Sequence, residues 1–589
     1  HQDLLPYLVR RLLENGANSS FVNRFLDAKV APETLLRDPV EQTQAQPLRR
    51  HPLIPLPREL YREEAAPWLN ARGIDLSDAA SVADLLRTVA LVAGQTFEAA
   101  PIVGGVSLAG ERREVINPAQ SDHVVGSVIE ADAQAVELAL DKAHAAQADW
   151  NACGVENRAA CLERAADLLE TECGQLIGLI VAEAGRTIDD ALDEVREAVD
   201  FCRYYAQQGR LGARCELPGP TGEINELSLH GRGVFLCISP WNFPLAIFTG
   251  QVAAALVAGN AVIAKPAEQT PLVAARMVRL LFLSGIPEQV LHLLPGDGAR
   301  VAGALVANER IAGVAFTGST ATARVINRQL AQRDGPIVPL IAETGGQNVM
   351  IVDATALPEQ VVDDVILSAF RSAGQRCSAL RVLYLQEDIA DAVIDMLAGA
   401  MQELELGNPA ALATDVGPVI DLDARQMLER HEMRMRSEGK LLARCELQDR
   451  HGMGYFVAPQ AYEINSLAQL PQEVFGPVLH VIRYPAQELP RVLDEINASG
   501  YGLTLGVHSR IDAFAREVFN ATRVGNTYIN RNMVGAVVGS NPFGGQGLSG
   551  TGPKAGGPNY LLRFATERTR TDNVVAKGGN TRLFNLTED

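Results

Sequence analysis

The chain has 589 residues, 47% of them hydrophobic, and a formal net charge of −19 at pH 7. Its length predicts two or three domains, and its composition is typical of a soluble globular protein. So acidic a chain is not expected to have nucleic acid or an anionic membrane as its main partner, although a phosphate-bearing cofactor needs only a local positive site.

The eight cysteines and ten histidines follow none of the common ligand spacings, because neither a C-x-x-C pair nor an H-E-x-x-H motif occurs. We therefore expect reduced thiols, a cytoplasmic location and no structural metal. The chain starts at His1, without a signal peptide, so we expect it to begin within a longer protein.

The first part of the chain reads as a helix over residues 1–26, followed by a segment rich in proline and charge over residues 38–67. The second segment is interpreted as a linker or an extended wrapping segment. Long amphipathic helices are predicted near residues 131–149, 155–173 and 187–207.

Residues 233–264 carry no charge and are long enough to span a bilayer. Prolines interrupt the stretch, which favours a strand, a loop and a buried helix over a membrane span, so we expect no membrane insertion. The predicted elements are a strand over 234–238, a helix over 246–257 and a strand over 261–264.

Strand and helix patterns then alternate, with further strands near residues 290–294 and 311–316. A second pattern of the same kind begins near residue 347 and runs past residue 480. Such alternation predicts an α/β protein built on parallel sheets with helices on both faces.

A glutamate and a cysteine 34 residues apart each lie in a glycine-rich turn, Glu343 in ETGG and Cys377 in GQRCS. Glu343 follows an apolar strand predicted over 336–342, where poor solvation raises the pKa of a carboxyl group and suits it to general-base catalysis. Cys377 is a candidate nucleophile, because a thiolate attacks carbonyl carbon readily. The other cysteines are expected to be buried packing residues, the usual place of a free cysteine.

Three more loops follow predicted strands. Asn242, in WNFP, is a candidate oxyanion donor, and the alternative is that it caps the next helix. Lys265 and Glu268 lie at the carboxyl end of a strand, where dinucleotides bind in open α/β sheets. Residues 316–320, FTGST, open a helix whose N–H groups suit a pyrophosphate. Taken singly, the last two loops are equally well explained as capped turns.

The motifs together resemble the aldehyde dehydrogenase superfamily over about residues 90–575. In chain order they are WNFP, KPAEQTP, FTGST, ETGG, GQRCSA, EVFGPV and NPFGG. The resemblance implies a parallel-sheet NAD-binding domain, an α/β catalytic domain and a small β oligomerisation flap. The chain departs from the family pattern at Ala323, where many relatives have glycine, and at Gln347, where lysine is frequent.

The resemblance also implies a catalytic cycle. Cys377 attacks an aldehyde, Asn242 and the backbone N–H of Cys377 stabilise the oxyanion, and Glu343 activates the water that hydrolyses a thioester. The cofactor-binding positions that it implies are Lys265 and Glu268 for the adenosine ribose, Gly318 and Ser319 for the pyrophosphate, and Glu473 and Phe475 for the nicotinamide ribose. An acidic residue at position 268 favours NAD over NADP.

Two features resemble the L-glutamate γ-semialdehyde (Δ1-pyrroline-5-carboxylate) dehydrogenases within the superfamily. Ser378 follows the nucleophile, and Gly535 and Ala536 precede NPFGG. In those enzymes the matching residues anchor the substrate's α-carboxylate, and free N–H groups in a glycine-bearing loop suit an anion. Phe243 is expected to contact the same small-molecule substrate. The resemblance therefore implies NAD-dependent oxidation of L-glutamate γ-semialdehyde to L-glutamate.

Residues 7–18 resemble the last barrel helix of the proline dehydrogenase domain in the bifunctional proline utilization A family. So short a piece cannot form a (β/α)₈ barrel, so we expect a remnant without flavin or proline oxidation. The alternative is a solvated helix with an Arg10–Glu14 pair.

The predicted domain organisation has four parts. They are a remnant helix and linker over 1–60, an NAD-binding domain over 61–341 with flap strands at about 213–229, a catalytic domain over 342–535, and a return to the NAD-binding domain with a C-terminal oligomerisation strand over 536–589. A polar, β-prone stretch at 561–575 suits pairing between subunits, so we expect a homodimer or a higher homo-oligomer. Two alternatives stay open at this point, a dehydrogenase of another aldehyde and a non-catalytic scaffold.

Overall fold

The computed structural model describes residues 67–574 without a gap. Before them it describes residues 8–9, 11–13, 21–27, 29–36, 38–45 and 54–62. The chain divides into two compact units, His1–Leu60 and Tyr61–Asp589.

The first unit contains short helices. They are α2 (Phe21–Leu26), α3 (Pro32–Leu35), α4 (Pro39–Gln44) and a 3₁₀ turn at Pro57–Glu59, and residues 8–9 and 11–13 are helical too. The rest of the helix predicted over residues 1–26 lies outside the described residues, as do Arg10 and Glu14. The prediction of an extended segment is wrong at α4, where Asp38 accepts a hydrogen bond from the N–H of Val40 at 2.7 Å and Pro39 begins the helix.

The second unit begins with helices and a small sheet. The helices are α5 (Ala79–Ala93), α6 (Ala133–Ala152), α7 (Val155–Thr171), α8 (Cys173–Ala184) and α9 (Ile188–Gly212). The sheet has the order β1-β5-β4, with β1 at Phe97–Ala99, β4 at Arg112–Asn117 and β5 at Gln120–Ile129. The three predicted long helices are confirmed as α6, α7 and α9.

A seven-stranded sheet follows in the order β12-β11-β8-β9-β10-β2-β3, and its first five strands are parallel. Its strands are β2 (Ile102–Val103), β3 (Val106–Ser107), β8 (Val234–Ile238), β9 (Ala261–Lys265), β10 (Leu291–Leu293), β11 (Ile311–Thr317) and β12 (Leu340–Glu343). The accompanying helices are α10 (Ala246–Val257), α11 (Pro271–Leu283), α12 (Gly303–Ala307) and α13 (Thr320–Ala331), with a π-helical turn at Gly298–Ala302. The uncharged stretch is therefore β8, α10 and β9, as predicted.

One predicted strand of this sheet is wrong in its extent. The strand expected over 336–342 is β12, which begins only at Leu340 and ends with Glu343 itself. Pro336 and Pro339 have no N–H to donate to a ladder, and Ile337 is fully exposed.

A second seven-stranded sheet has the order β15-β16-β17-β14-β13-β19-β20 and is parallel except for the β15–β16 pair. Its strands are β13 (Val349–Val352), β14 (Val382–Gln386), β15 (Lys440–Arg444), β16 (Gln460–Glu463), β17 (Val478–Tyr484), β19 (Thr504–His508) and β20 (Asn526–Ile529). Its helices are α14 (Pro358–Phe370), α15 (Glu387–Gln402), α16 (Leu422–Glu438), α17 (Leu489–Ala498) and α18 (Asp512–Ala521). The predicted α/β class with parallel sheets is thus confirmed.

Each large sheet has its own hydrophobic core. The second core runs from Val349 to Met533, whereas the first ends at Ala342 and takes in Val538, Tyr560, Leu561 and Phe564 from the returning chain. The passage between the cores, residues 343–348, contains Glu343, so the candidate base lies where the two cores meet.

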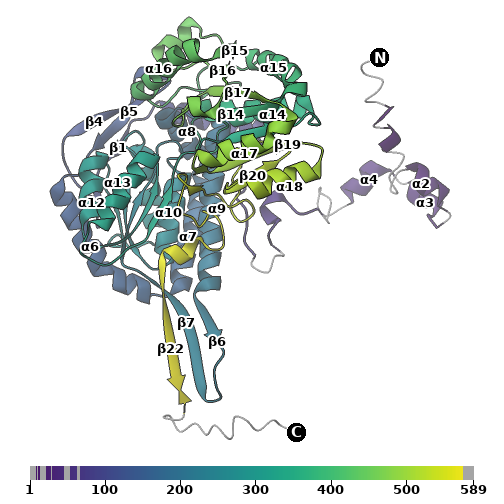
Figure 1. Cartoon of the computed structure of the whole chain (residues 1–589). Coiled ribbons are helices and arrows are strands. Elements are labelled where there is room, and N and C mark those ends of the chain that lie inside the picture. Colours follow the sequence, from purple (N-terminus) through teal and green to yellow (C-terminus); the bar gives the residue numbers. More distant parts are fainter. Residues whose placement is uncertain are drawn as a thin grey trace. The chain divides into compact units, whose positions relative to one another are not determined.

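Three antiparallel strands in the order β22-β7-β6 form the flap, which extends away from the rest of the second unit (Figure 1). They are β6 (Arg214–Leu217), β7 (Glu223–Gly231) and β22 (Ala565–Asn573), which confirms the predicted strands. A short pair, β18 (Tyr501–Gly502) with β21 (Gln546–Gly547), completes the described strands.

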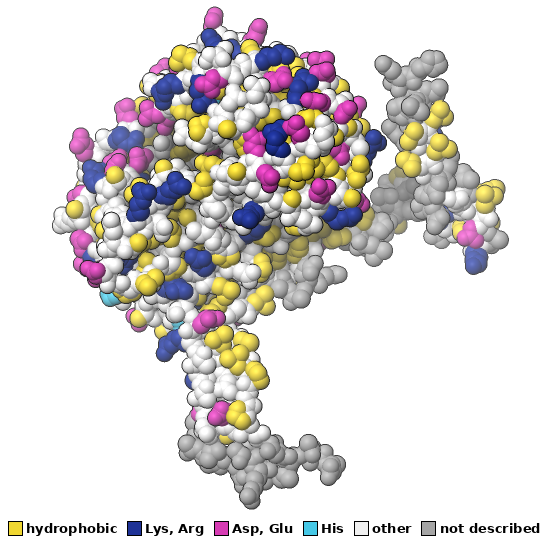
Figure 2. All heavy atoms as spheres, viewed as in Figure 1, with side chains coloured by type: hydrophobic (Ala, Val, Ile, Leu, Met, Phe, Trp, Pro, Cys, Tyr) yellow, Lys and Arg dark blue, Asp and Glu magenta, His cyan; other side chains and the backbone are white. Residues whose placement is uncertain are grey.

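The surface and the helices bear on possible partners. Acidic and basic side chains are interspersed over the face of the second unit that Figure 2 shows. Among the described helices, none combines the length and the apolar composition needed to cross a membrane.

Candidate active site

The turn before Cys377 is tight and depends on unusual backbone angles. After α14 the chain places Ser372, Ala373 and Gly374 in the left-handed region, with φ of 55°, 53° and 65°. Only glycine fits at position 374, because a Cβ there would lie 2.2 Å from the carbonyl oxygen of Gly476. Such strain persists where surrounding contacts hold it.

Two side chains hold this turn by hydrogen bonds to its carbonyl oxygens. Arg381, 1% exposed, donates from its guanidinium to the carbonyl oxygens of Gly374 at 2.7 Å and Arg376 at 2.9 Å. Asn348 donates from Nδ2 to the carbonyl oxygen of Cys377 at 2.6 Å. Neither residue is predictable as part of the site from the sequence, since both resemble ordinary residues at strand ends.

The Cys377 thiol is half-buried and held in its neutral form. Burial raises the pKa of Cys377 to about 12, the carboxylates of Glu473 and Glu343 raise it too, and Arg381 lowers it. Attack by this sulfur at neutral pH therefore needs a base to take the proton. Of the other cysteines, Cys215 is exposed and Cys153 and Cys173 are half-buried, so their predicted burial is wrong.

Asn242 reaches across from the first sheet to the nucleophile's turn. It lies in the loop after β8, 8% exposed, and donates from Nδ2 to the carbonyl oxygen of Gln375 at 2.9 Å. The alternative role of helix cap is wrong, because Glu194 Oε1 accepts the N–H groups of Leu245 at 2.7 Å and Ala246 at 3.2 Å at the start of α10.

Phe243, next to Asn242, lies under two buried arginines. The guanidinium carbon of Arg186 is 4.2 Å from its ring centroid and that of Arg376 is 5.4 Å away. Arg376 also bonds Asp190 at 2.6 Å, and that pairing holds the pKa of the Asp190 carboxyl well below its usual range despite burial. The ring is thereby fixed beside the turn of Cys377.

Glu343 ends β12 with its carboxylate against the NPFGG glycines. Its Oε2 accepts the N–H of Gly545 at 3.0 Å, and its Oε1 is buried without a hydrogen-bond partner among the described residues. A Cβ on Gly544 would lie 2.9 Å from Oε1, so any other residue there would push the carboxylate away. Burial raises the pKa of Glu343 from 4.5 to about 8, against the lowering effects of the Gly545 N–H and Lys554.

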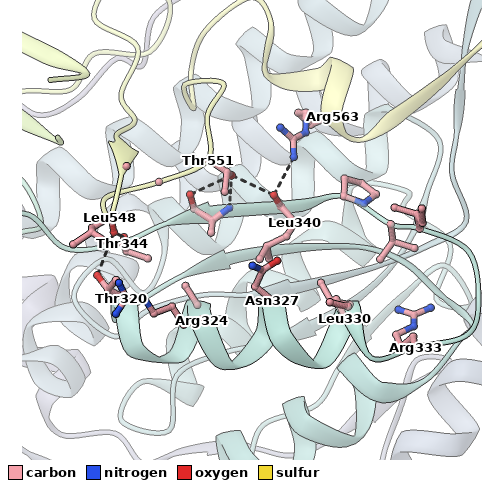
Figure 3. A pocket seen from close by; sticks show the side chains of 18 of the residues that line it. Thr320, Arg324, Asn327, Leu330, Arg333, Leu340, Thr344, Leu548, Thr551 and Arg563 are labelled. Carbon is pink, nitrogen blue, oxygen red and sulfur yellow. Dashed lines mark hydrogen bonds between the residues drawn. The ribbon is translucent and has the colours of Figure 1, made fainter. Parts of the chain in front are cut away.

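The returning chain covers the open edge of β12. The N–H of Thr551 donates to Ala342 and the N–H of Thr344 to Ser549, at 2.9 and 3.0 Å. Figure 3 shows Thr551 and Arg563 over Leu340, with a pocket of about 550 Å³ between this strand and α13. The pocket is lined by Thr344 and Leu548 rather than by Glu343, so it lies beside the candidate site.

The predicted cofactor residues lie at the carboxyl ends of β9 and β11. Lys265 Nζ is 3.6 Å from Glu268 Oε1, which also accepts the N–H of Gly298 at 2.7 Å. Ser319 caps α13, accepting the N–H of Thr322 at 3.1 Å, and the N–H of Gly318 donates to the carbonyl oxygen of Glu343 at 3.1 Å. The backbone of the candidate base is thus tied to the helix start.

Glu473 and Phe475 are joined to the nucleophile's turn through Arg381. The Glu473 carboxylate is 2.9 Å from the Arg381 guanidinium, whose central carbon lies 5.1 Å from the Phe475 ring centroid. Phe475 also packs edge-on against Trp241, with centroids 5.6 Å apart. Loops from both sheets therefore meet around Cys377.

Comparison with known proteins identifies the family. The sequence pattern of the aldehyde dehydrogenase family matches residues 106–570. The chain belongs to the aldehyde dehydrogenase family. Residues 1–24 match the proline dehydrogenase family.

The relatives of this chain fall into two groups. It is 51% identical to the bifunctional protein PutA of Escherichia coli (strain K12), over 98% of this chain and 44% of that protein. It is 37% identical to the 1-pyrroline-5-carboxylate dehydrogenase of Anoxybacillus flavithermus, over 82% of this chain and 94% of that protein. A solved variant of Bradyrhizobium japonicum proline utilization A aligns with TM-score 0.85 and 52% identity, over 98% of this chain and 55% of that chain. The chain spans about half the length of the bifunctional relatives.

The loop expected to anchor the substrate touches the nucleophile's turn. Arg376 donates to the carbonyl oxygen of Val534 at 3.3 Å, directly before Gly535 and Ala536. Ser378, 9% exposed, directly follows Cys377, and Arg376 directly precedes it. The hydrogen bond therefore ties the residue before Gly535 to the residue before Cys377, and the contacts of Ser378, Gly535 and Ala536 with a substrate stay predictions.

The two residues that depart from the family pattern, Gln347 and Ala323, have different surroundings in the structure. Gln347 donates from Nε2 to the carbonyl oxygen of Leu470 at 2.9 Å, which fixes the passage after Glu343 to the loop that carries Glu473. Ala323 is partly buried within α13 and packs against the first core.

Proposed function

We propose that this chain oxidises L-glutamate γ-semialdehyde, formed from Δ1-pyrroline-5-carboxylate, to L-glutamate with NAD in proline catabolism. The observation that carries the proposal is the hydrogen bond from Asn242 to Gln375, 2.9 Å long, which brings an amide donor two residues from the candidate nucleophile. The similarity to a protein named 1-pyrroline-5-carboxylate dehydrogenase, over 82% of this chain and 94% of that protein, supports this substrate.

The proposed chemistry starts at Cys377. The Cys377 thiol loses its proton to solvent water, the resulting thiolate attacks the aldehyde carbon, and the carbonyl oxygen becomes an oxyanion. The second N–H of the Asn242 amide and the backbone N–H of Cys377 stabilise that oxyanion. NAD, when bound, would supply the hydride acceptor that converts the thiohemiacetal on Cys377 into a thioester. Glu343 then activates the water that releases the carboxylic acid.

The residues around the strand ends fit NAD by their chemistry. Lys265 and Glu268 offer hydrogen bonds to ribose hydroxyls, and Gly318 and Ser319 at the start of α13 suit a pyrophosphate. Glu473 and Phe475 lie against Arg381 near Cys377, where a nicotinamide ribose would have to reach.

The proposed substrate contacts are Ser378, Gly535, Ala536 and Phe243. Backbone N–H groups in the Gly535–Ala536 loop suit an α-carboxylate, because such loops form anion-binding concavities. The phenyl ring of Phe243, held by Arg186, would bound the aliphatic part of the substrate.

The test compares NADH formation from Δ1-pyrroline-5-carboxylate and from propanal. A preference of at least about tenfold in kcat/KM for the former is expected if a carboxylate anchor contributes one good charged contact. Equal kcat/KM values for the two substrates would support aldehyde oxidation but would mean that another aldehyde is the substrate. The absence of NADH from both would favour a scaffold. Ser378→Ala should reduce the preference, whereas Cys215→Ala on the flap is a matched control.

We further propose that the NAD-binding domain covers 61–341 and the returning chain 536–589, with the catalytic domain over 342–535 between them. The separate cores support this division. Free cysteines support a cytoplasmic, reducing location.

We also propose a homodimer joined through the flap. Strand β22 is an edge of its sheet, and Leu217 and Ile224 remain 38% and 47% exposed on the same flap, where Figure 2 shows hydrophobic side chains. Light scattering should give twice the 63.2 kDa chain mass or a higher multiple, and a mass of one chain would contradict it.

A further inference from the structure

Two buried histidines face each other next to β14, the strand that follows Cys377. One of them lies on β17, which pairs with β14. His431 on α16 and His480 on β17 are 8% and 0% exposed, and their Nε2 atoms are 2.9 Å apart. Their rings meet edge to face, with centroids 5.1 Å apart. Neither residue belongs to the proposed cofactor or substrate contacts.

The hydrogen-bond chemistry allows this pair one arrangement of protons. His480 Nδ1 lies 3.1 Å from the carbonyl oxygen of Arg381, which only accepts, so Nδ1 carries the hydrogen. His480 Nε2 then accepts, and His431 Nε2 must donate to it. His431 Nδ1 in turn faces an Arg434 guanidinium nitrogen at 3.5 Å and accepts from it. The chain of donors therefore runs one way, from Arg434 to Arg381.

Both imidazole rings must be neutral for this series of hydrogen bonds to form, and their surroundings keep them neutral. Burial and the charge of Arg434 lower the pKa of His431 to about 4. Burial and the neighbouring His431 lower the pKa of His480 to about 3; the charges of Arg434 and Arg381 lower it too, and the hydrogen bond to the Arg381 carbonyl oxygen raises it. The charged groups that face the pair are thus the two arginines at its ends.

This row of hydrogen bonds ends at Arg381, the residue that holds the turn of Cys377. The carbonyl oxygen of Arg381 accepts from both the backbone N–H of His480 at 3.0 Å and its Nδ1, while the Arg381 N–H donates to Asn348 at 3.0 Å. From this anchored backbone the guanidinium reaches Gly374 and Glu473 at 2.7 and 2.9 Å.

We propose that His431 and His480 are positioning residues of the active site, whose one-way hydrogen-bond chain fixes the Arg381 backbone and, through its side chain, Glu473 and the turn of Cys377. The inference rests on the proposed function for its kinetic meaning. A fully bonded polar pair in a core specifies one geometry, whereas apolar side chains of the same size would only fill the space.

The test separates hydrogen bonding from packing with paired variants. His480→Asn keeps a side-chain N–H donor near the position of Nδ1, and His431→Gln keeps one near Nε2, whereas His480→Leu and His431→Leu remove the donor. We expect each Leu variant to lower kcat/KM for NAD about tenfold, as the loss of a buried hydrogen bond predicts, and each amide variant to stay within about threefold of wild type. Thermal unfolding shows that the compared proteins are folded.

A second readout does not depend on the substrate or the cofactor. The alkylation rate of Cys377 by iodoacetamide, followed by mass spectrometry, reports on the turn itself. We expect a change of about fivefold or more in the Leu variants and recovery in the amide variants. Equal rates in both kinds of variant would overturn the positioning role. If wild type forms no NADH, the proposed function fails, and the alkylation rates still decide this inference.

Discussion

The carboxylate of Glu473 lies directly against the backbone of Gly345, because a Cβ on residue 345 would be 1.8 Å from Glu473 Oε2. The turn of the candidate base and the loop that carries Glu473 are therefore packed without space for one methyl group. Gly345 follows Glu343 by two residues, so this contact couples the general base to the expected nicotinamide side of the site.

We predict that Gly345→Ala lowers kcat/KM for NAD by about 10²-fold, the scale of a displacement of about 1 Å in a catalytic site. The physical reason is that Glu473 must move away from Arg381. Gly399→Ala is the matched control, because the space around Gly399 in α15 is open and helix propensity favours alanine there. Steady-state kinetics with varied NAD measures both, and wild-type kinetics for Gly345→Ala would contradict the packing argument.

We predict a pH dependence from Glu343, whose pKa burial raises to about 8. Only the carboxylate is a base, so thioester hydrolysis should speed up as pH rises through about 8 and level off above it. The opposite trend, fastest turnover in acid, would exclude Glu343 as the base.

Glu343→Gln provides the direct test of the same step. Because the amide cannot activate water, rapid mixing should show a burst of NADH that matches the number of Cys377 sites and then stops. Cys377→Ala should give no burst while still binding NAD. Continuous turnover by Glu343→Gln at a wild-type rate would assign the base elsewhere.

We predict that Asn242→Ala lowers kcat about 10²–10³-fold, the usual effect of losing one oxyanion donor. The midpoint of thermal unfolding should fall only by the effect of one lost buried hydrogen bond, the one to Gln375, because Glu194 rather than Asn242 caps α10. Asn242→Asp keeps the shape but replaces the donor by an acceptor, so it should be no more active than the alanine variant. Near-normal turnover in both variants would mean that Asn242 does not stabilise the oxyanion and only forms its hydrogen bond to Gln375.

Elements with a local signal were predictable from the sequence. The uncharged stretch resolves into β8, α10 and β9 almost at the predicted residues, because prolines and glycines punctuate it. Helix α8 was missed, because nine consecutive residues from Leu176 to Ala184 are buried and leave no polar face to reveal a period. Helix α5 carried a readable pattern in Leu85, Val89 and Val92 that the sequence analysis did not use.

Contacts in the candidate site between residues far apart in the sequence could not be predicted from local patterns. Cys377, Glu343 and Asn242 were recognisable as types of residue in particular turns, but their support comes from residues distant in the chain. Arg381 and Glu473 are 92 positions apart, and Glu343 meets Gly545 across 202. Pairing at such separations follows from the packing of two sheets, which no local pattern encodes.

The last prediction concerns the choice of cofactor and rests on Glu268. Its Oε1 is held by the N–H of Gly298 at 2.7 Å and lies 3.6 Å from Lys265, so the carboxylate has a fixed place at the end of β9. A carboxylate there bonds a ribose 2′-hydroxyl and repels a 2′-phosphate. We expect wild type to prefer NAD over NADP by more than about tenfold in kcat/KM, and Glu268→Ser to narrow that ratio by raising KM for NAD and lowering KM for NADP. Glu403→Ser, at an exposed position after α15, should keep the wild-type ratio. If Glu268→Ser also kept it, the carboxylate would not be the discriminating group, and the preference would have to come from the start of α13.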